Sequence, residues 1–302
     1  MSKLVSVIVV TYNREKDIAL CLTSVSKSNY DNYEVIVVDN ASNDNTVEVL
    51  EKNYCNKIKL IKSDENLMAG GGRNLGVKHA KGEYFLFIDS DNIIDKEMIN
   101  ELVNGAESLN DAGMVGPIMY YFKKPDTIWW AGADINFWTS KTKYIGIDET
   151  DKGQYSEIRK VGHIPNVYMV KKSVWDSVGG IDIDFVMHYE ESDLAEKIKK
   201  NGFGIYIIPT AKTWHNIPLP KKGLRGTIGL DNRCRIFYAA RNRILFMMKY
   251  ASRLNFLIFI FIYNNIYLLI YCFILLLYGR IDLIFSYIKG YLSGVIWALK
   301  RI

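Results

Sequence analysis

Cysteine is scarce in this chain, which has only four among its 302 residues: Cys21, Cys55, Cys234 and Cys272. No two of them stand in a close C-x-x-C spacing, so the sequence suggests neither a zinc site nor a disulfide framework. Such sparing use of cysteine fits a reducing, cytosolic compartment. Because 49% of the residues are hydrophobic, the chain can bury a sizeable core without covalent cross-links.

The sequence also lacks a leader of the secretory kind. Its opening stretch, MSKLVSVIVVTYNRE, shows no ordered succession of charged, apolar and cleavage-site regions, so we expect a first β-strand there instead. There is no internal repeat and no low-complexity linker. These absences favour one continuous globular fold over an array of modules.

Charge of one sign is not in marked excess. The formal net charge is +5, and acidic and basic residues are interleaved along most of the chain, so nothing indicates a nucleic-acid partner. The exception is a pair of basic segments, PKKGLRG and RCRIFYAARNR, that stand just before a very apolar stretch. This order predicts a basic surface that meets anionic lipid headgroups.

The apolar stretch, residues 254–278, contains no charge and is about long enough to span a bilayer as a helix. Asn264 and Asn265 interrupt its centre, which favours a re-entrant or interface-lying arrangement over a simple span. Residues 281–302 place apolar side chains on one helical stripe and predict an interfacial amphipathic helix. Basic residues flank the apolar stretch on both sides, so the charges give no topology.

Strand and helix patterns alternate through the first third of the chain. Continuous β-branched or apolar runs predict buried strands, and segments with helical spacing separate them; the runs are residues 4–12, 33–42, 58–63 and 84–89. Strict alternation predicts βαβ units and therefore an α/β fold with a mainly parallel, Rossmann-like sheet. Ligands bind such sheets outside the carboxyl ends of the strands.

Two carboxylates, Asp89 and Asp91, follow the fourth predicted strand with only Ser90 between them. One interpretation is a turn with helix-capping aspartates. The other is a site for a hard divalent cation, since magnesium and manganese use few protein ligands and keep open positions for substrate phosphates. The place of the pair, at the mouth of a parallel sheet, favours the second interpretation.

Asp39 ends the second predicted strand, where it is either the start of an Asx-turn or an acceptor for a nucleobase or ribose group. The glycine run before Arg73, residues 70–72, resembles a phosphate cradle ahead of a helix. It lacks the G-x-G-x-x-G spacing and follows the third strand rather than the first. A nicotinamide-binding Rossmann domain is therefore disfavoured.

Three acids, Glu190, Glu191 and Asp193, crowd the start of a helix predicted within residues 189–203. Acids favour the positive end of a helix, but one would suffice, so a general base is the alternative. His215 is either a structural histidine or a further metal ligand. Three tryptophans are either core residues or stacking platforms for a sugar ring: Trp129, Trp130 and Trp138.

Several of these motifs occur together in a fixed order: VSVIVVTYNR, VIVVDNAS, NLMAGGGRNLGVKHAKGEYFLFIDSD, GGID, YEESDLAEKIKKNGF and TWH. This order, over Leu4 to Tyr250, resembles the family 2 inverting glycosyltransferases of the GT-A fold, and among them the rhamnosyltransferase-type members. The resemblance implies a nucleotide-diphospho-sugar donor and a divalent metal, Mg²⁺ or Mn²⁺. It also implies a glycan or lipid-linked acceptor.

The resemblance also implies roles for particular residues. Asp89 would contact the ribose, Asp91 would bind the metal, and Asp39 would contact the nucleobase. His215, considered above as a metal ligand, is expected to join Asp91. The catalytic base of the family is the second acid of a Glu-Asp pair; here the pair is Glu190-Glu191, so the expectation falls on Glu191, with Glu190 as the alternative. The remaining donor contacts are expected at Thr11, Tyr12, Asn13, Asn66, Arg73 and Ser90.

The prediction is therefore a metal-dependent, inverting, hexosyltransferase-type enzyme on the cytoplasmic face of the cell membrane. Residues 1–250 would form the glycosyltransferase domain, with 1–115 binding the donor and 116–250 the acceptor, and residues 251–302 would form membrane-associated helices. One alternative is a metal-dependent nucleotidyltransferase acting on sugar phosphates, which would release pyrophosphate rather than a nucleoside diphosphate. Another is a catalytically inactive sugar-binding module, which the intact acids disfavour.

Overall fold

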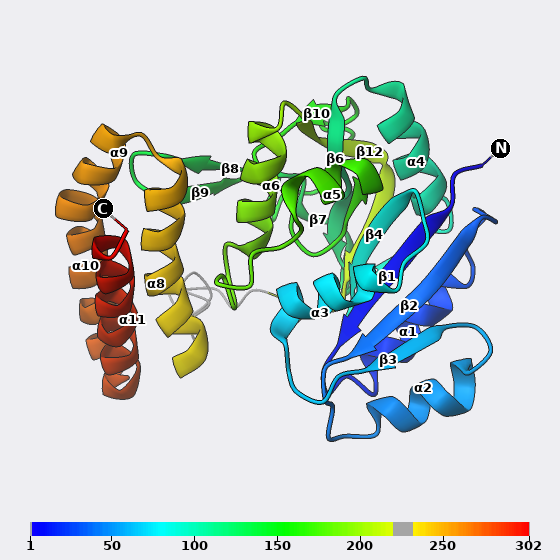
Figure 1. Ribbon diagram of the computed structural model, residues 1–302, viewed down its shortest axis with the longest axis horizontal. Helices are drawn as coiled ribbons and strands as arrows, with labels where there is room; N and C mark the ends of the chain where they lie inside the picture. The colour runs from blue at the N-terminus through cyan, green and yellow to red at the C-terminus, as the bar shows by residue number, and fades with distance from the viewer. Residues whose placement is uncertain (1, 220–231, 302) are drawn as a thin grey trace. The chain divides into compact units, whose positions relative to one another are not determined.

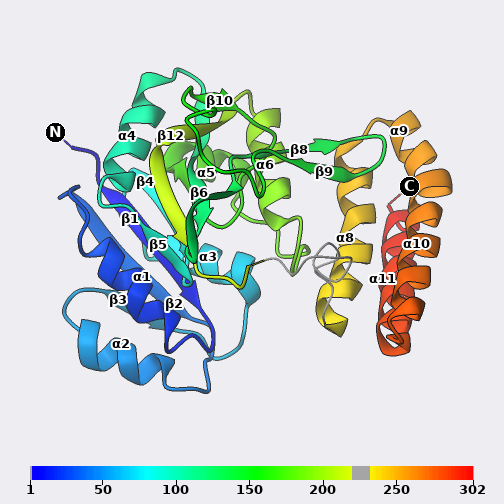
Figure 2. The same ribbon diagram turned by 180° about the vertical axis from the view of Figure 1, so that it is seen from behind.

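The computed structural model describes residues 2–219 and 232–301, and within them the chain forms two compact units (Figures 1 and 2). The first unit contains Met1–Asp134, Tyr144–Asp182 and Leu194–Leu219. The second contains Ile135–Lys143, Ile183–Asp193 and the described residues from 232 onward. The division of function predicted at residues 115 and 250 stays a prediction, and α8 (Arg233–Tyr250) groups with the C-terminal helices.

The first part of the chain alternates between strands and helices, as the sequence predicts. Its elements are β1 (Val5–Thr11), α1 (Asp17–Val25), β2 (Tyr33–Asp39), α2 (Thr46–Tyr54), β3 (Lys59–Lys62), α3 (Met68–Lys78), β4 (Tyr84–Asp89), β5 (Asn92–Ile94) and α4 (Met98–Ser108). Strands β4, β1, β2 and β3 are neighbours in that order, and every pair among them is parallel. The predicted α/β fold is thus confirmed for this part.

The next part extends the same sheet with strands of both directions. Its elements are β6 (Ala112–Tyr121), β7 (Lys124–Trp130), β8 (Ala133–Asn136), β9 (Lys141–Tyr144), β10 (Arg159–Lys160), β11 (Tyr168–Lys171), α5 (Lys172–Val178), α6 (Glu190–Lys200) and β12 (Gly204–His215). The sheet has ten strands, with the main order β10-β12-β6-β11-β4-β1-β2-β3, and β8 with β9 forms a separate pair. Strand β11 is antiparallel to both neighbours, whereas β12 is parallel to β6.

Strand register brings the polar ends of the parallel strands together. Thr11 pairs with Asp39 across β1 and β2, and Val10 pairs with Asp89 across β1 and β4. Every residue of β1 from Val5 to Val9 is fully buried, because helices cover both faces of the sheet. The continuous apolar run therefore forms a buried strand, and the pairing register places Thr11, Asp39 and Asp89 at one edge of the sheet.

The glycine run expected to form a cradle ahead of a helix lies inside α3 instead, so that prediction is wrong. A Cβ at Gly72 would stand 2.6 Å from Cγ1 of Val10, and one at Gly76 would stand 2.5 Å from Cγ2 of Ile8. These contacts leave no room for a side chain. The glycines let α3 pack directly on β1.

The described C-terminal part is helical. It consists of α8, α9 (Arg253–Ile258), a π-helical turn η1 (Phe259–Tyr263), α10 (Asn264–Leu277) and α11 (Ile281–Leu299). The run Arg253–Leu277 is long and apolar enough to cross a membrane, and only 11% of its most apolar window is buried, unlike a core helix. The helix continues through the π-turn and through Asn264 and Asn265, so the prediction that these two residues interrupt it is wrong. Asn265 Nδ2 donates to the carbonyls of Ile260 (3.1 Å) and Phe261 (2.9 Å) in the preceding turn.

Helix α11 packs closely against α8 through a small-residue stripe (Figure 1). A Cβ at Gly290 would stand 2.2 Å from the carbonyl oxygen of Phe237, and one at Gly294 would stand 3.0 Å from that of Arg241. Glycines four residues apart allow helix backbones to approach in this way, as in many membrane helix pairs.

Candidate active site

The carboxyl ends of β1 and β2 carry two buried oxygen atoms without a hydrogen-bond partner among the described residues. Asp39 is 2% exposed; its Oδ2 accepts from the backbone N–H of Ser42 at 3.0 Å, and its Oδ1 has no partner. Thr11 Oγ1 is likewise buried without a partner. Asp39 thus makes the turn contact and keeps one oxygen for a donor group from outside the protein.

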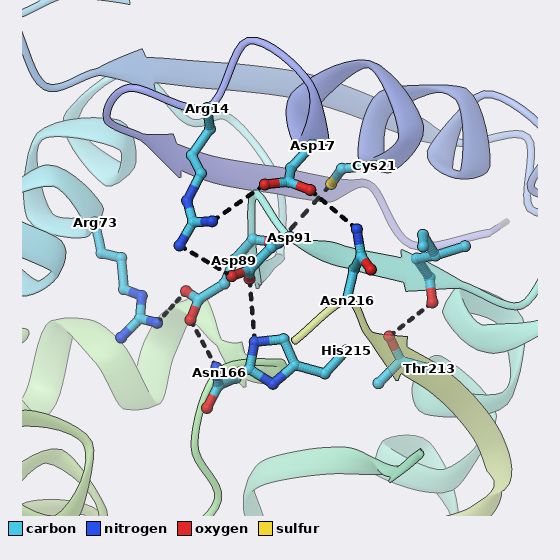
Figure 3. Close-up of polar contacts among 11 residues, drawn as sticks. Arg14, Asp17, Cys21, Arg73, Asp89, Asp91, Asn166, Thr213, His215 and Asn216 are labelled. Atoms are coloured by element: carbon cyan, nitrogen blue, oxygen red, sulfur yellow. Dashed lines mark hydrogen bonds and ion pairs between the residues drawn. The ribbon is translucent and has the colours of Figure 1, made fainter. Parts of the chain in front are cut away.

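Asp89 is held from two sides at the end of β4 (Figure 3). Its Oδ1 accepts from Arg73 Nη2 at 2.6 Å, and its Oδ2 accepts from Asn166 Nδ2 at 2.9 Å. Arg73 is 2% exposed and lies over the ring of Tyr168, 5.3 Å from its centroid. The two partners fix the direction of the Asp89 carboxylate.

Asp91 lies next to His215, although 123 residues separate them in the sequence. His215 Nε2 is 3.2 Å from Asp91 Oδ1, and Arg14 Nη2 is 3.3 Å from Asp91 Oδ2. Strand pairing makes this meeting possible, because His215 of β12 stands opposite Asn92 of β5. The backbone N–H of Asn216 also donates to the Asp91 carbonyl at 2.8 Å.

The environment of Asp91 favours its charged form. Burial opposes ionisation, but the hydrogen bond and charge of His215 and the charge of Arg14 outweigh it, so the pKa of Asp91 lies below its ordinary value. Arg14 also pairs with Asp17 at 3.1 Å, and Asn216 Nδ2 donates to the other oxygen of Asp17 at 3.0 Å (Figure 3). The result is an ionised carboxylate within a network of alternating charges.

Asp91 and His215 offer one oxygen ligand and one nitrogen ligand that converge. No group of three or more His, Cys, Asp or Glu side chains within residues 2–219 and 232–301 is arranged to hold a metal by itself. Mg²⁺ and Mn²⁺ nevertheless tolerate a site with few protein ligands, because phosphates and water complete the coordination. The pair therefore suits a divalent cation that arrives with a phosphate ligand.

Of the other expected donor contacts, Asn13 and Asn66 have local structural partners. Asn13, in a left-handed conformation with φ 52°, donates from its backbone to Ser42 Oγ at 2.9 Å and accepts from the backbone of Asn43. Asn66 Oδ1 accepts from the backbone N–H of Met68 at the start of α3. Tyr12 is exposed and Ser90 is buried. Binding roles for these four residues stay predictions.

The tryptophans differ from one another. Trp129 packs edge-on against His215, with ring centroids 4.4 Å apart, and so supports the imidazole. Trp130 is buried at 5% exposure in the core, whereas Trp138 is 47% exposed. Trp130 is thus closed to a sugar ring, whereas the partly exposed Trp129 and the exposed Trp138 are open to the expected stacking.

The acidic pair Glu190-Glu191 opens α6 after an unusual backbone. His188 and Tyr189 both have a left-handed conformation, with φ of 67° and 68°. Asn242 of α8, which is fully buried, donates from Nδ2 to the carbonyls of Met187 at 2.7 Å and His188 at 3.1 Å. A side chain from a distant helix thus holds the backbone that precedes the acids.

A buried ion pair secures the first turn of α6. Asp193 is fully buried, and its Oδ1 accepts from Lys249 Nζ at 2.5 Å and from the Tyr250 hydroxyl at 2.6 Å. Of the three clustered acids, Asp193 is therefore engaged in the structure of the unit. Glu190 is 9% exposed, and Glu191 is more exposed than Glu190.

Sequence reasoning missed four participants: Arg14, Asn166, Asn216 and Asn242. Arg14 ends the motif VSVIVVTYNR and Asn216 directly follows the motif TWH, so both stand next to residues that were selected. Asn166 and Asn242 follow no pattern in the sequence. Their roles depend on tertiary contacts with Asp89 and with residues 187–188.

Comparison with known proteins agrees with this geometry. The family model described as "Glycosyl transferase family 2" matches residues 6–164, which is more than half of the chain. The chain is 26% identical over 180 residues to glycosyltransferase GlyG of Streptococcus pneumoniae, covering 59% of this chain and 60% of GlyG. It is 42% identical over 91 residues to the Escherichia coli UDP-Glc:alpha-D-GlcNAc-diphosphoundecaprenol beta-1,3-glucosyltransferase WfgD, covering 30% of this chain and 36% of WfgD.

The chain thus spans less than two thirds of the length of either relative. Among solved structures, it is similar to the mannosyltransferase PcManGT of Pyrobaculum calidifontis in complex with GDP-Man and Mn²⁺, with a TM-score of 0.60, 14% identity, and coverage of 98% of this chain and 88% of PcManGT. This likeness confirms the GT-A fold. The rhamnosyltransferase-type likeness stays a prediction. By its family match, its fold and its strand-end carboxylates, the chain belongs to glycosyl transferase family 2.

Proposed function

We propose that this chain transfers a sugar from a nucleotide-diphospho-sugar to a hydroxyl group of a lipid-linked glycan, with inversion at the anomeric carbon. The observation that supports this most is the edge of the sheet where Asp39 and Asp89 end the two strands that flank β1, Asp91 follows Asp89, and His215 joins them. Family membership limits the reaction class to glycosyl transfer. The comparisons do not support the nucleotidyltransferase alternative.

The donor nucleotide would bind at the ends of β1, β2 and β4. Asp39 Oδ1 and Thr11 Oγ1 are buried oxygens without partners among the described residues, and nucleobase N–H or ribose O–H groups would satisfy them. Asp89, directed by Arg73 and Asn166, would accept from a ribose hydroxyl. Arg73 would then act by orienting Asp89 rather than by direct contact.

Asp91 and His215 would hold Mg²⁺ or Mn²⁺ together with the diphosphate. When bound, the cation would neutralise charge that develops on the leaving diphosphate. Arg14, already beside Asp91, would add a second positive charge near the same group. PcManGT, a protein of the same fold, is known in complex with Mn²⁺.

Glu191 would act as the general base. Its carboxylate would take the proton from the acceptor hydroxyl while the oxygen attacks the anomeric carbon on the face opposite the diphosphate, which inverts the configuration. Glu190 is the more buried of the two acids, so Glu191 is better placed to reach an acceptor. The clamp of Asn242 on residues 187–188 would keep the base in position.

The acceptor would be lipid-linked and the protein would work at the cytoplasmic face of the membrane. The exposed apolar surface of α9, η1, α10 and α11 includes Leu257, Phe261, Leu269, Phe273 and Phe285. Burying such a surface in lipid is favourable by about 25 cal/mol per Å². WfgD is named for an acceptor carried on diphosphoundecaprenol.

A donor screen tests the proposal. The purified full chain, in detergent with Mn²⁺, would be incubated with UDP-, GDP- and dTDP-sugars and a lipid-linked acceptor, and the released nucleotide would be identified by chromatography. We expect a nucleoside diphosphate with one class of donor. Release of pyrophosphate, or no turnover with any donor, would contradict the proposed function.

A further inference from the structure

Arg243, in the middle of α8, is surrounded by tyrosine rings of the same helical unit. Its guanidinium carbon lies 4.5 Å from the ring centroid of Tyr267 and 5.5 Å from that of Tyr271. Tyr271 in turn stacks on Tyr287, with centroids 5.1 Å apart, and Tyr287 is 1% exposed. The rings come from α10 and α11, so three helices enclose one cation.

Aromatic rings satisfy the face of a guanidinium but not its edge. The N–H groups lie in the plane of the group and need acceptors there. Arg243 Nε is buried and has no hydrogen-bond partner among the described residues, whereas Nη1 donates to the Tyr287 hydroxyl at a long 3.5 Å and the Tyr271 hydroxyl also accepts from the guanidinium. The Nε side of the Arg243 edge is therefore left without an acceptor from the described residues.

No carboxylate within residues 2–219 and 232–301 pairs with Arg243. The groups that act on its charge are the phenols of Tyr189, Tyr271 and Tyr287, and none of these is a carboxylate. Two acids of the same unit form ion pairs with other residues: Asp193 with Lys249, and Asp282 with Arg280. A partly buried charge without an opposite charge is costly, and an external anion would remove that cost.

A second donor lies on the same face of α10. Asn264 is 1% exposed, and its Nδ2 has no hydrogen-bond partner among the described residues. It precedes Tyr267 by three residues and Tyr271 by seven, which places all three on one side of the helix. The facing surfaces of α8 and α10 thus carry two N–H donors, Arg243 Nε and Asn264 Nδ2, that have no hydrogen-bond partner among the described residues.

The location of these donors relates them to the acidic pair. Arg243 follows Asn242, whose side chain holds the carbonyl of His188, and the charge of Arg243 acts on both His188 and Tyr189. These two residues immediately precede Glu190. An anion beside Arg243 would therefore lie near the segment that carries the proposed base.

We propose that Arg243 and Asn264 bind the phosphate group of the lipid-linked acceptor. A planar guanidinium edge matches phosphate oxygens better than any neutral ligand does, and the surrounding helices expose an apolar surface suited to the lipid chain. This inference rests on the proposed function, because it supplies the recognition element for that acceptor.

Binding can be measured without donor chemistry. The full chain in detergent with EDTA would be titrated calorimetrically with geranylgeranyl diphosphate, which carries a lipid-borne phosphate and no sugar. EDTA removes metal-dependent binding at Asp91. We expect Arg243→Gln to weaken binding roughly tenfold or more, since hydrogen bonds to a charged group are among the strong ones, and Asn264→Ala to weaken it several-fold.

Lys289→Gln is the matched control, because it removes one positive charge from an exposed position on the neighbouring helix α11. An exposed charge contributes little, so binding should stay within about twofold of the wild-type value. Arg243→Lys keeps the charge but not the planar edge, and should bind with intermediate affinity. If circular dichroism shows that Arg243→Gln does not fold, the affinity of Arg243→Lys is the test instead, and wild-type affinity in that variant would contradict the inference.

Wild-type affinity in a folded Arg243→Gln protein, or an equal loss in Lys289→Gln, would overturn the inference. So would a parallel loss of binding to phosphatidylglycerol vesicles, because the site would then serve bilayer headgroups, or equally tight binding of inorganic pyrophosphate, because the lipid would then be irrelevant. Arg243-dependent binding in a protein that turns over no donor would leave the inference standing and refute only the proposed function.

Discussion

The two groups of acids in this chain are positioned in different ways. Asp39 and Asp89 follow strands of one sheet, and their places are set by strand register with β1. Glu190 and Glu191 follow two left-handed residues whose backbone is held by the side chain of Asn242 on α8. A strand end is a local consequence of an apolar run, whereas the second arrangement depends on a residue more than fifty positions away.

The largest expected effect is a loss of transfer rate on substitution of Glu191, and it distinguishes Glu191 from Glu190 as the base. Glu191→Gln should lower the rate of transfer by ~100-fold to 10,000-fold, because glutamine keeps the shape of the side chain but cannot accept the acceptor proton. Donor affinity should not change, since the base acts mainly in the transition state. Initial rates and calorimetric donor binding measure the two quantities separately.

Glu190→Gln is the control for that experiment. A rate near the wild-type value in this variant supports Glu191 as the base. If Glu190→Gln is inactive and Glu191→Gln is active, the assignment is wrong by one residue. If both variants are active, residues 189–193 do not supply the base.

Substitution of a strand-end carboxylate should weaken ligand binding, which the Glu191 substitution should leave unchanged. Asp91→Ala should abolish metal-dependent binding of a nucleoside diphosphate and lower turnover by ~100-fold or more, because it removes a metal ligand beside the leaving group. Calorimetry with and without Mn²⁺ checks this. Asp176→Ala, which removes an exposed aspartate of α5 paired with Lys172, should leave both quantities unchanged. Unaltered metal dependence in the Asp91 variant would exclude it as a ligand.

Asn242→Ala tests the clamp on the acidic segment. It leaves two backbone carbonyls without their donor, and we expect the protein to lose about 1–3 kcal/mol of stability. The turnover number should fall roughly tenfold while the KM for the donor stays constant, because misplacing the base affects only the chemical step. Asn201→Ala removes an exposed amide at the end of α6 and should do neither. A change in donor KM would show that Asn242 acts elsewhere.

The smallest effect concerns acid stability. Burial, and then the charges of Arg235 and Arg243, lower the pKa of His188 to about 4 from an ordinary value of 6.5. The native state therefore stays neutral there while the unfolded state takes up a proton, so stability is complete above pH 6.5 and declines as the pH falls towards 4. His188→Asn, which tolerates the left-handed backbone, should reduce the loss of melting temperature between pH 7.5 and pH 5. Identical acid profiles for both proteins would contradict this.

The same contrast explains what could be predicted from sequence. The apolar runs before Asp39 and Asp89 reveal strands, and a carboxylate after a strand indicates a site at the sheet edge. The pairing of Asp91 with His215 follows from the order of the family motifs. The glycines of α3 were misread because glycine serves close helix packing as readily as it serves phosphate binding. Asn166 and Asn242 were missed because an asparagine amide gives no periodic signal.

The glycine contacts between α8 and α11 have a mechanical consequence. A Cβ at Gly290 would stand only 2.2 Å from the Phe237 carbonyl, so the two helix backbones lie in direct contact and we expect them to move together. If α11 is embedded in lipid as proposed, the bilayer fixes the height of α8 and, through Asn242, that of the segment before Glu190. The proposed base would then keep a set distance from the lipid surface, so it would act only on acceptor hydroxyl groups held at that distance.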